Sequence, residues 1–536
     1  MPHFRDSTGR SDRRYLFTTL GASLFLLSFE LMRPLNGDNE IYQSMARELI
    51  RYHSLPYIGS WDQNFPGIVY LHWLSIIFFG NSAIGFRSFD VCFHLIMSWL
   101  FFRLLRRWLT PQLSLVAVLF YNFHYISGGL GIAGERDAFA AGFLIASTVF
   151  WYVILDKQSS SRRLKLTYAF AAGISIAIVI ALRPTYGLFL FVGLAFLFRI
   201  HDRWLLIVSF IAGCSLVFLA ILIPYLLIPG GIEQLYFSTI SYNFDIWAQL
   251  RLPLYWLFFR IRQQKLFFVL GLMGLAFTSI PLVQRYLPRI KIVLNHVSPP
   301  SKIDLFLIGS YGFIGIASVL MMGKYWPYHF EVVILALAPF GAIGLQSAVQ
   351  SLPRRSYKVA GIILLSGYSL FRVFPLYLVI AFFSSIAQHQ TSTLGDSYSC
   401  EPGFPASVDA YVARYLDRSI PPGGRFECAS RMAGVRWRVH RQSASRFTTF
   451  YPLIMTDPHG HHPDFQKAWR REYIDSLLSA RPYYLVCSTV PVDTSILDIP
   501  SPAVCIHTIP GFDSEILPHY QFDTVMGTYV IWKRRS

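Results

Sequence analysis

Long apolar runs separated by short polar stretches dominate the chain. A bilayer core about 30 Å thick requires about 20 apolar residues in a spanning helix. Hydrophobic residues make up 54% of the 536 residues and charged residues only 14%, which excludes an ordinary soluble fold. We therefore predict a polytopic α-helical membrane protein with eleven spans, near residues 15–33, 84–105, 112–132, 138–155, 167–182, 187–200, 205–228, 266–284, 303–322, 329–350 and 359–382.

Basic clusters in alternate loops predict the orientation of these spans. Lys and Arg mark cytoplasmic loops, so the N-terminus is expected inside and, after an odd number of spans, the C-terminus outside. The apolar stretch Gly67–Gly80 is short, and a span there would put Arg103–Arg107 on the wrong side, so we predict an interfacial helix. The formal net charge of +17 comes with no basic groove or stacking platform, so no nucleic-acid partner is expected.

The last part of the chain has a different composition. We predict a transmembrane domain at 1–382, a polar linker at 383–405 and a small soluble extracytoplasmic α/β domain at 406–536. In that last domain the pattern predicts helices at 407–416 and 464–479 and strands at 425–429, 483–487 and 528–532. An oxidising compartment also predicts at least one disulfide among Cys400, Cys428, Cys487 and Cys505.

Polar residues at the predicted outer ends of the helices form the candidate site. Ionisable groups at membrane depth are expensive, so finding them there indicates function, although short outer loops can simply be hydrated. Cations outside run against the orientation bias, and a bound phosphate would account for them. The candidates are Asp38, Glu40, Asp62, Arg136, Asp137, Arg183, Lys324, Tyr325, Tyr328 and His329.

Asp38 has two possible roles. Asp is a favoured N-cap residue, so Asp38 can cap the helix that begins near Glu40. A carboxylate in a short outer loop can also act as a general base that takes a proton from a hydroxyl group. Spacing alone favours the cap.

Four motifs together resemble a known superfamily. They are GDNEIYQSMARELI (37–50), SLPYIGSWDQNFPGIVYL (54–71), GERDAFAAGF (134–143) and KYWPYHFEVVILALAP (324–339). In this order they resemble the dolichyl-phosphate-mannose-protein mannosyltransferase-like superfamily of C-type membrane glycosyltransferases (GT-C). That superfamily includes the aminoarabinose and lipopolysaccharide-core transferases of bacteria. The resemblance extends over nearly the whole chain and implies a GT-C-like fold.

The resemblance also implies residue roles. The superfamily's first-loop acid falls on Asp38, with Tyr42, Ala46 and Arg47 completing its pattern, and this reverses the preference for a cap. The acid that usually follows is here Asn39, so Glu40 is the second catalytic candidate.

The other three motifs also match, the second outer motif only in part. The Asp-Pro-Gly frame falls on Asp62, Pro66 and Gly67, but its usual lysine is Asn64. If that lysine meets a lipid phosphate, another cation must replace it, and Arg183, Lys324 or the basic stretch after Arg251 are the alternatives. Other matches are Asp137, at the start of a span, and the Tyr328–His329 pair.

The implied activity is an inverting transfer of a sugar from a polyprenyl-phosphate donor to a glycan, lipid or protein hydroxyl. It is expected on the extracytoplasmic face of a bacterial inner membrane, with the lipid bilayer as a further partner. No obligate cofactor is expected; a divalent cation shared by the acids Asp38, Glu40, Asp62 and Asp137 is possible. The alternative is a transporter or flippase of a lipid-linked or small polar substrate, which would need polar groups at the membrane midplane. A non-catalytic scaffold or sensor is a third class.

Overall fold

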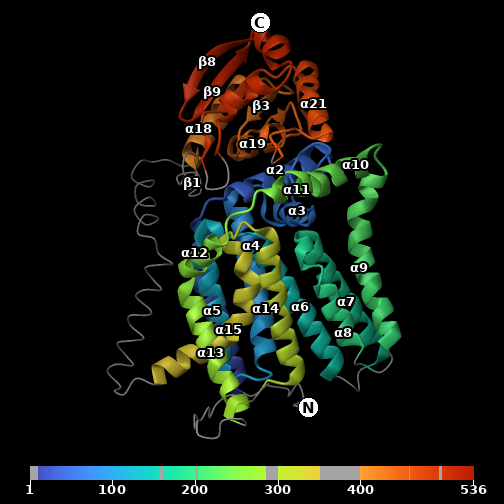
Figure 1. Cartoon of the computed structure of the whole chain (residues 1–536), viewed down its shortest axis with the longest axis vertical. Coiled ribbons are helices and arrows are strands. Elements are labelled where there is room, and N and C mark those ends of the chain that lie inside the picture. The colour runs from blue at the N-terminus through green and yellow to red at the C-terminus, as the bar shows by residue number, and fades with distance from the viewer. Residues whose placement is uncertain are drawn as a thin grey trace. The chain divides into compact units, whose positions relative to one another are not determined.

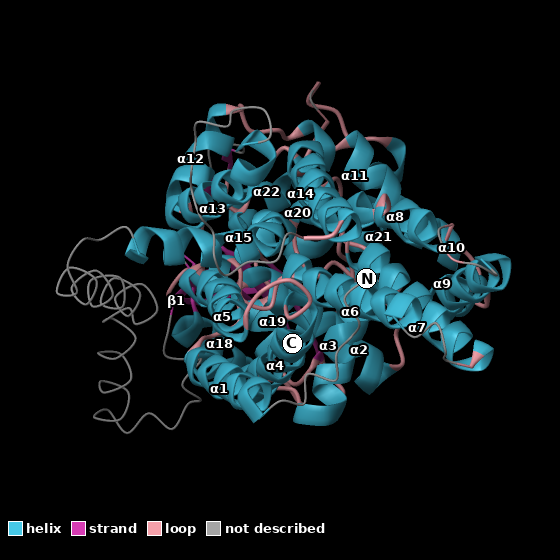
Figure 2. Cartoon of the chain, turned by 90° about the horizontal axis from the view of Figure 1, so that it is seen from below, coloured by secondary structure: helices cyan, strands magenta, loops and turns pink. Residues whose placement is uncertain are grey.

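The chain forms two compact units that each combine distant segments. The structure, a computed structural model, describes residues 10–156, 161–198, 200, 203–284, 300–350, 399–401, 404–457, 459–493 and 498–535. The first unit contains Met1–Leu31, Arg87–Leu219 and Pro253–Ile380. The second contains Met32–Phe86, Ala220–Leu252 and Ala381–Ser536. Figure 1 shows the chain coloured by residue number, and Figure 2 shows that helix predominates.

Apolar helices make up most of the first unit. Its helices, two of which begin or end in the second unit, are α1 (Arg10–Leu27), α4 (Ala83–Leu105), α5 (Pro111–Ser127), α6 (Arg136–Asp156), α7 (Arg162–Leu182), α8 (Phe189–Leu197), α9 (Arg203–Leu226), α12 (Tyr255–Gln263), α13 (Lys265–Gln284), α14 (Lys302–Met322) and α15 (Glu331–Gln350).

These helices confirm a multi-pass membrane protein. Every predicted span before residue 350 overlaps one of them. Among the described residues, seven helices are long and apolar enough to cross a membrane. Pro184–Leu197 and Lys265–Ser279 are shorter apolar helices, so the total of eleven spans stays a prediction. The predicted span at 359–382 lies outside the described residues.

Local sequence explains how these helices begin and pack. Thr110 caps α5 by accepting a hydrogen bond from the Leu113 amide, and Pro111 follows at the first helical position. Helices α13 and α15 touch through glycine: a Cβ at Gly274 would lie 1.8 Å from the Phe340 carbonyl oxygen. Only a residue without a side chain permits this approach.

The second unit contains helices from two of the predicted outer loops and an α/β fold. The earlier helices are α2 (Gly37–Tyr52), α3 (Gly67–Phe79), α10 (Gly231–Tyr236) and α11 (Tyr242–Asp245). Helix α3 coincides with the predicted interfacial helix; its position in a membrane interface stays a prediction. Because these segments share a compact unit with the C-terminal fold, the units do not follow a linear division of the chain, and the predicted domain limits are untested.

A five-stranded sheet is the centre of the C-terminal fold. The strands are β3 (Arg425–Ala429), β4 (Gln442–Ser443), β5 (Tyr484–Ser488), β8 (Tyr520–Met526) and β9 (Tyr529–Arg534), in the order β4-β3-β5-β9-β8. Strand β3 runs parallel to β4 and β5, whereas β9 is antiparallel to β5 and β8. Two short antiparallel pairs join β1 (Ser399–Glu401) to β2 (Phe404–Pro405) and β6 (Val492–Asp493) to β7 (Asp498–Ile499).

Helices cover both faces of this sheet. Along β5, Leu485 and Cys487 enter a core with α21 (Asp464–Ala480), while Tyr484 and Val486 enter a core with α18 (Ala406–Ser419). This alternation is the period of two expected of a strand. The predicted helices and the predicted strands in β3, β5 and β9 are confirmed; β4, β8, α19 (Gly434–Arg438), α20 (Tyr451–Ile454) and α22 (Pro502–Cys505) were not predicted.

The disulfide prediction is wrong for the cysteines that the structure describes. Cys428, Cys487 and Cys505 are free thiols, and the Cys400 side chain is outside the described part. Cys428 pairs in register with Val486, and Ala429 with Cys487, so the two cysteines point to opposite faces of the sheet. The α18-side core therefore holds Cys428 and the α21-side core holds Cys487.

Candidate active site

The predicted site residues lie in two groups, one in each compact unit. Asp38, Glu40, Asp62 and Asn64 belong to the second unit. The seven others belong to the first unit: Arg136, Asp137, Arg183, Lys324, Tyr325, Tyr328 and His329.

Asp38 lies in the first turn of α2 but does not cap it. Asn36 is the N-cap, and its Oδ1 accepts a hydrogen bond from the Asn39 amide at 2.8 Å. The cap alternative for Asp38 is therefore wrong: the chain enters the helix two residues earlier, with another favoured cap residue. Asp38 is half-buried, and a carboxylate in this turn is stabilised by the helix dipole.

Glu40 is committed to an ion pair. Its Oε1 lies 2.8 Å from Nη1 of Arg438, and both side chains are largely buried. Such a contact neutralises the carboxylate's charge and fixes its direction. The second catalytic candidate thus has a structural partner.

The second acidic motif is tied to the same helix. The Asn64 amide donates to Oδ2 of Asp62 at 3.0 Å, and Asn64 Nδ2 donates to the Tyr42 hydroxyl at 2.9 Å. Tyr42 lies four residues after Asp38, which is on the same side of a helix. Asn64, at the position where a lysine was expected, thus joins Asp62 to the face of α2 that carries Asp38.

Asp137 is the centre of the first unit's group. It is the second residue of α6 and is fully buried, and it accepts hydrogen bonds from Arg183 and, at 2.6 Å, from the Tyr186 hydroxyl. Arg183 directly follows α7. The ion pair means that Arg183 already has an anionic partner, which weakens its candidacy for a lipid phosphate.

The loop between α14 and α15 completes this group. Tyr325 is buried with φ of 52°, which is uncommon for a bulky residue and indicates local strain. Tyr328 and His329 stack edge-to-face with ring centroids 4.7 Å apart. The His329 ring is buried, and it interacts electrostatically with three cations, Arg136, Arg183 and Lys324.

Several polar residues in this unit were not predicted. The Tyr121 hydroxyl donates to Oε2 of Glu331 at 2.6 Å, and His124 Nδ1 lies 3.2 Å from Oε1 of Glu331. His124 Nε2 is 3.0 Å from Oε1 of Gln264. In α4, Arg87 and His94 flank Asp90, which accepts from the Tyr125 hydroxyl at 2.6 Å. The sequence signal that could have predicted them is an ionisable residue inside an apolar run.

The described ranges contain no group of three or more His, Cys, Asp or Glu side chains placed to hold a metal ion. The divalent cation stays a prediction.

Comparison with known proteins identifies the fold. Residues 63–228 match the family model described as dolichyl-phosphate-mannose-protein mannosyltransferase. The crystal structure of ArnT from Cupriavidus metallidurans bound to undecaprenyl phosphate matches over 97% of this chain and 97% of that chain, with a TM-score of 0.54 and 12% identity. The chain has the fold of the GT-C mannosyltransferase-like superfamily. The apo form of the same ArnT matches over 97% of this chain and 98% of that chain, with a TM-score of 0.54 and 13% identity.

The GT-C match has a defined extent. The part of the chain that matches the mannosyltransferase family model begins after Asp38 and includes Asn64, Arg136, Asp137 and Arg183. A search of curated protein sequences gives no match.

Proposed function

We propose that this GT-C protein is an inverting glycosyltransferase. It moves a sugar from a polyprenyl-phosphate donor to a hydroxyl group of a cell-envelope glycan, lipid or protein. The reaction takes place on the extracytoplasmic face of a bacterial inner membrane, and Asp38 is the general base.

The observation that carries this proposal is the N-terminus of α2. Asn36 caps the helix and Glu40 is paired with Arg438, so residues on both sides of Asp38 hold this turn in place. Asp38 lies between them, half-buried. A half-buried carboxylate on a well-held helix suits a base that must keep one geometry and still reach a substrate.

The chemistry is a single displacement. Asp38 takes the proton of the acceptor hydroxyl as its oxygen attacks the anomeric carbon. A new carbon–oxygen bond forms while the bond from that carbon to the phosphate oxygen breaks. The polyprenyl phosphate leaves with the electron pair, and the anomeric centre is inverted.

The donor class is supported by the shared fold. ArnT from C. metallidurans has this fold and was crystallised with undecaprenyl phosphate. Cations stabilise a departing phosphate, and Arg136, Lys324 and Arg183 are our candidates for that task. Asp62, Asn64, Tyr325, Tyr328 and His329 are the remaining candidates for substrate binding.

The test is a transfer assay with the purified full-length protein. A panel of undecaprenyl-phosphate monosaccharides, each with a radiolabelled pentose, hexose or amino sugar, is incubated with envelope lipids and glycans, with EDTA or with Mg²⁺. Label should enter an acceptor with one donor, and Asp38→Asn should slow this transfer about 10²–10⁴-fold. The product's anomeric configuration, determined by NMR, should be opposite to the donor's.

Other outcomes would reject the proposal. Retained configuration would exclude a single displacement. Movement of labelled lipid across a vesicle membrane without transfer would favour the transporter. Mass spectrometry of envelope glycolipids and glycoproteins with and without the gene would then identify the sugar and acceptor directly.

A further inference from the structure

One face of α2 carries three charged side chains that bind the C-terminal fold of the same unit. Glu40, Arg47 and Glu48 follow the i, i+7, i+8 spacing that puts residues on one side of a helix. All three are buried. Their partners are α19 and the residue that directly follows it, Val439, and we call this set of contacts the α2 clasp.

Arg47 binds the end of α19. Its Nη1 donates to the carbonyl oxygens of Trp437 at 2.5 Å and Val439 at 2.8 Å, and its Nη2 donates to that of Arg436 at 3.0 Å. The last carbonyls of a helix have no partner within the helix and carry partial negative charge. A guanidinium supplies several donors in one plane, so it satisfies three of them at once.

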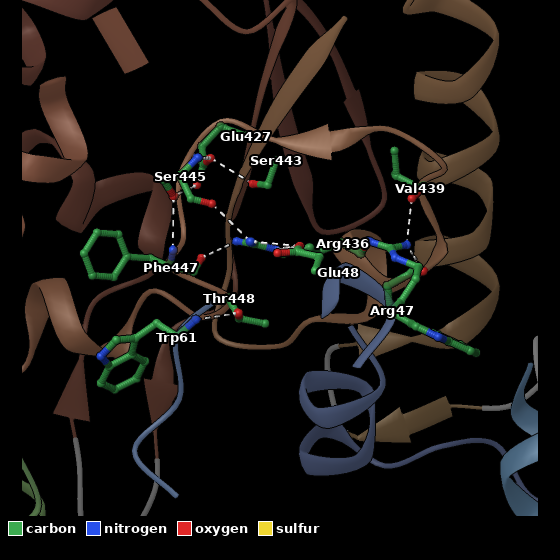
Figure 3. A network of polar contacts seen from close by, with 11 residues as sticks. Arg47, Glu48, Trp61, Glu427, Arg436, Val439, Ser443, Ser445, Phe447 and Thr448 are labelled. Carbon is green, nitrogen blue, oxygen red and sulfur yellow. Dashed lines mark hydrogen bonds and ion pairs between the residues drawn. The ribbon is translucent and has the colours of Figure 1, made fainter. Parts of the chain in front are cut away.

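Glu48 connects α2 to the sheet through Arg436, as Figure 3 shows. Arg436 donates from Nε and Nη2 to Oε1 of Glu48 at 3.1 and 3.0 Å, and also to the carbonyls of Ser445 and Phe447. Ser445 is held in turn by Glu427 of β3, which accepts from its amide at 2.9 Å and its hydroxyl at 2.8 Å. A continuous polar chain thus runs from the sheet to α2.

The third contact reaches the turn that carries Asp38. Arg438 pairs with Glu40, two residues after Asp38. Gly434 lets α19 come close there, since a Cβ on it would lie 1.9 Å from Oδ2 of Asp409 and 3.1 Å from Oε2 of Glu40. A side chain at Gly434 would therefore collide first with Asp409 of α18 and would also crowd Glu40.

The contacts of the α2 clasp are better suited to fixing the orientation of α2 than to stabilising the folded protein. Removing charges from water costs several kcal/mol per ion, and apolar packing often stabilises as well or better. Charged side chains with several hydrogen bonds each do define one orientation of α2.

We propose that the C-terminal fold positions Asp38 through the α2 clasp, with Arg47, Arg436 and Arg438 as positioning residues for the transfer reaction. This inference rests on the proposed function, because it requires Asp38 to be the base. A displacement of about 1 Å at a reacting group can cost about 10²-fold in rate. Loosening α2 should therefore lower kcat more than it changes donor binding.

The experiment compares Arg47→Gln, Arg47→Lys and Gly434→Ala in the full-length protein, using the undecaprenyl-phosphate monosaccharide active in the transfer assay. We expect kcat to fall about 10- to 100-fold for Arg47→Gln, with KM changed by less than about threefold. Arg47→Lys keeps the positive charge but lacks the planar set of guanidinium donors, so its kcat should lie between that of Arg47→Gln and that of the unchanged protein. The rate of hydrogen exchange at the α2 amides should rise in the same variants, most in those that lose most kcat.

Tyr520→Phe is the matched control. It removes a buried hydrogen bond of 2.7 Å, to the Pro482 carbonyl, from the C-terminal fold without touching α2. It should lower thermal stability and leave kcat of the folded enzyme unchanged. A comparable loss of kcat in Tyr520→Phe would mean that any weakening of this fold reduces activity, and the clasp would have no special role.

A double variant separates this inference from the proposed function. If Arg47 acts through Asp38, Arg47→Gln/Asp38→Asn should be no slower than Asp38→Asn alone. An inactive Asp38→Asn beside fully active Arg47→Gln and Gly434→Ala would overturn the clasp and leave the base intact. An active Asp38→Asn would overturn both. If Arg47→Gln fails to fold, Arg47→Lys and Gly434→Ala decide by the same criteria.

Discussion

The Oδ1 atom of Asn36 accepts a hydrogen bond from the Asn39 amide at 2.8 Å and thereby caps the N-terminus of α2, two residues before Asp38. The two polar residues on either side of Gly37 thus have different tasks. Asn36 caps the helix, and Asp38 is the base that we propose for the transfer reaction.

Asp38→Asn should therefore lower kcat strongly and leave stability nearly unchanged. Asparagine keeps the size of the side chain but accepts no proton at neutral pH. General-base assistance contributes about 10²–10⁴-fold, so kcat should fall by that factor. Steady-state kinetics with the active undecaprenyl-phosphate monosaccharide and a thermal unfolding curve measure both quantities.

Asn36→Ala is the reciprocal control. Loss of an N-cap costs about 0.5–2 kcal/mol, so its unfolding temperature should drop while Asp38 remains present. If Asp38→Asn lowers the unfolding temperature more than Asn36→Ala does, Asp38 is a structural residue after all.

Much of the fold was predictable because local patterns determine it. The apolar runs predicted the helices, and strand-length runs predicted β3 and β5 almost to the residue. The cap was harder, because Asn36 and Asp38 are both good cap residues and only the backbone decides between them.

The partners of α2 were not predictable. Glu40 and Glu48 meet Arg438 and Arg436 almost 400 positions along the chain, and no local pattern encodes such pairs. The disulfide prediction failed for a related reason. Counting cysteines gives no information on which face of a sheet each one occupies, and register places Cys428 and Cys487 on opposite faces.

The pairing of Glu40 with Arg438 predicts a thermodynamic coupling. Glu40→Gln and Arg438→Gln should each destabilise the protein, because each removes one charge of a largely buried ion pair. Breaking a buried pair costs about 3–5 kcal/mol. Glu40→Gln/Arg438→Gln should cost less than the sum of the two. Unfolding free energies from a denaturant titration give the coupling; simple additivity would mean that the ion pair contributes nothing.

The buried thiols predict a labelling pattern. Burial raises the pKa of the Cys428 and Cys487 thiols, so little reactive thiolate forms in the folded protein at pH 8. Iodoacetamide should label neither site before unfolding and both, with Cys505, after unfolding without reductant. Peptide mass spectrometry reads each site separately. A site blocked until reductant is added would show that it forms a disulfide.

The orientation prediction can be tested at the C-terminus. Basic clusters in alternate loops predict that Ser536 lies outside the cytoplasm. Alkaline phosphatase fused after Ser536 should be active in cells, and green fluorescent protein fused there should be dark. The opposite pattern would put the C-terminal fold inside, where an extracytoplasmic acceptor is absent.

The contact between Arg183 and Asp137 distinguishes a structural cation from one that binds the donor. Arg183→Gln leaves Asp137 buried with Tyr186 as its remaining side-chain donor among the described residues, so we expect a loss of about 3–5 kcal/mol in unfolding free energy. Tyr186→Phe, which removes the other hydrogen bond to Asp137, should cost about 1 kcal/mol. Lys324→Gln is the comparison for phosphate binding and should raise KM for the undecaprenyl-phosphate monosaccharide. If Arg183→Gln keeps its stability and raises that KM as much as Lys324→Gln does, then Arg183 binds the donor phosphate and its contact with Asp137 serves to orient it.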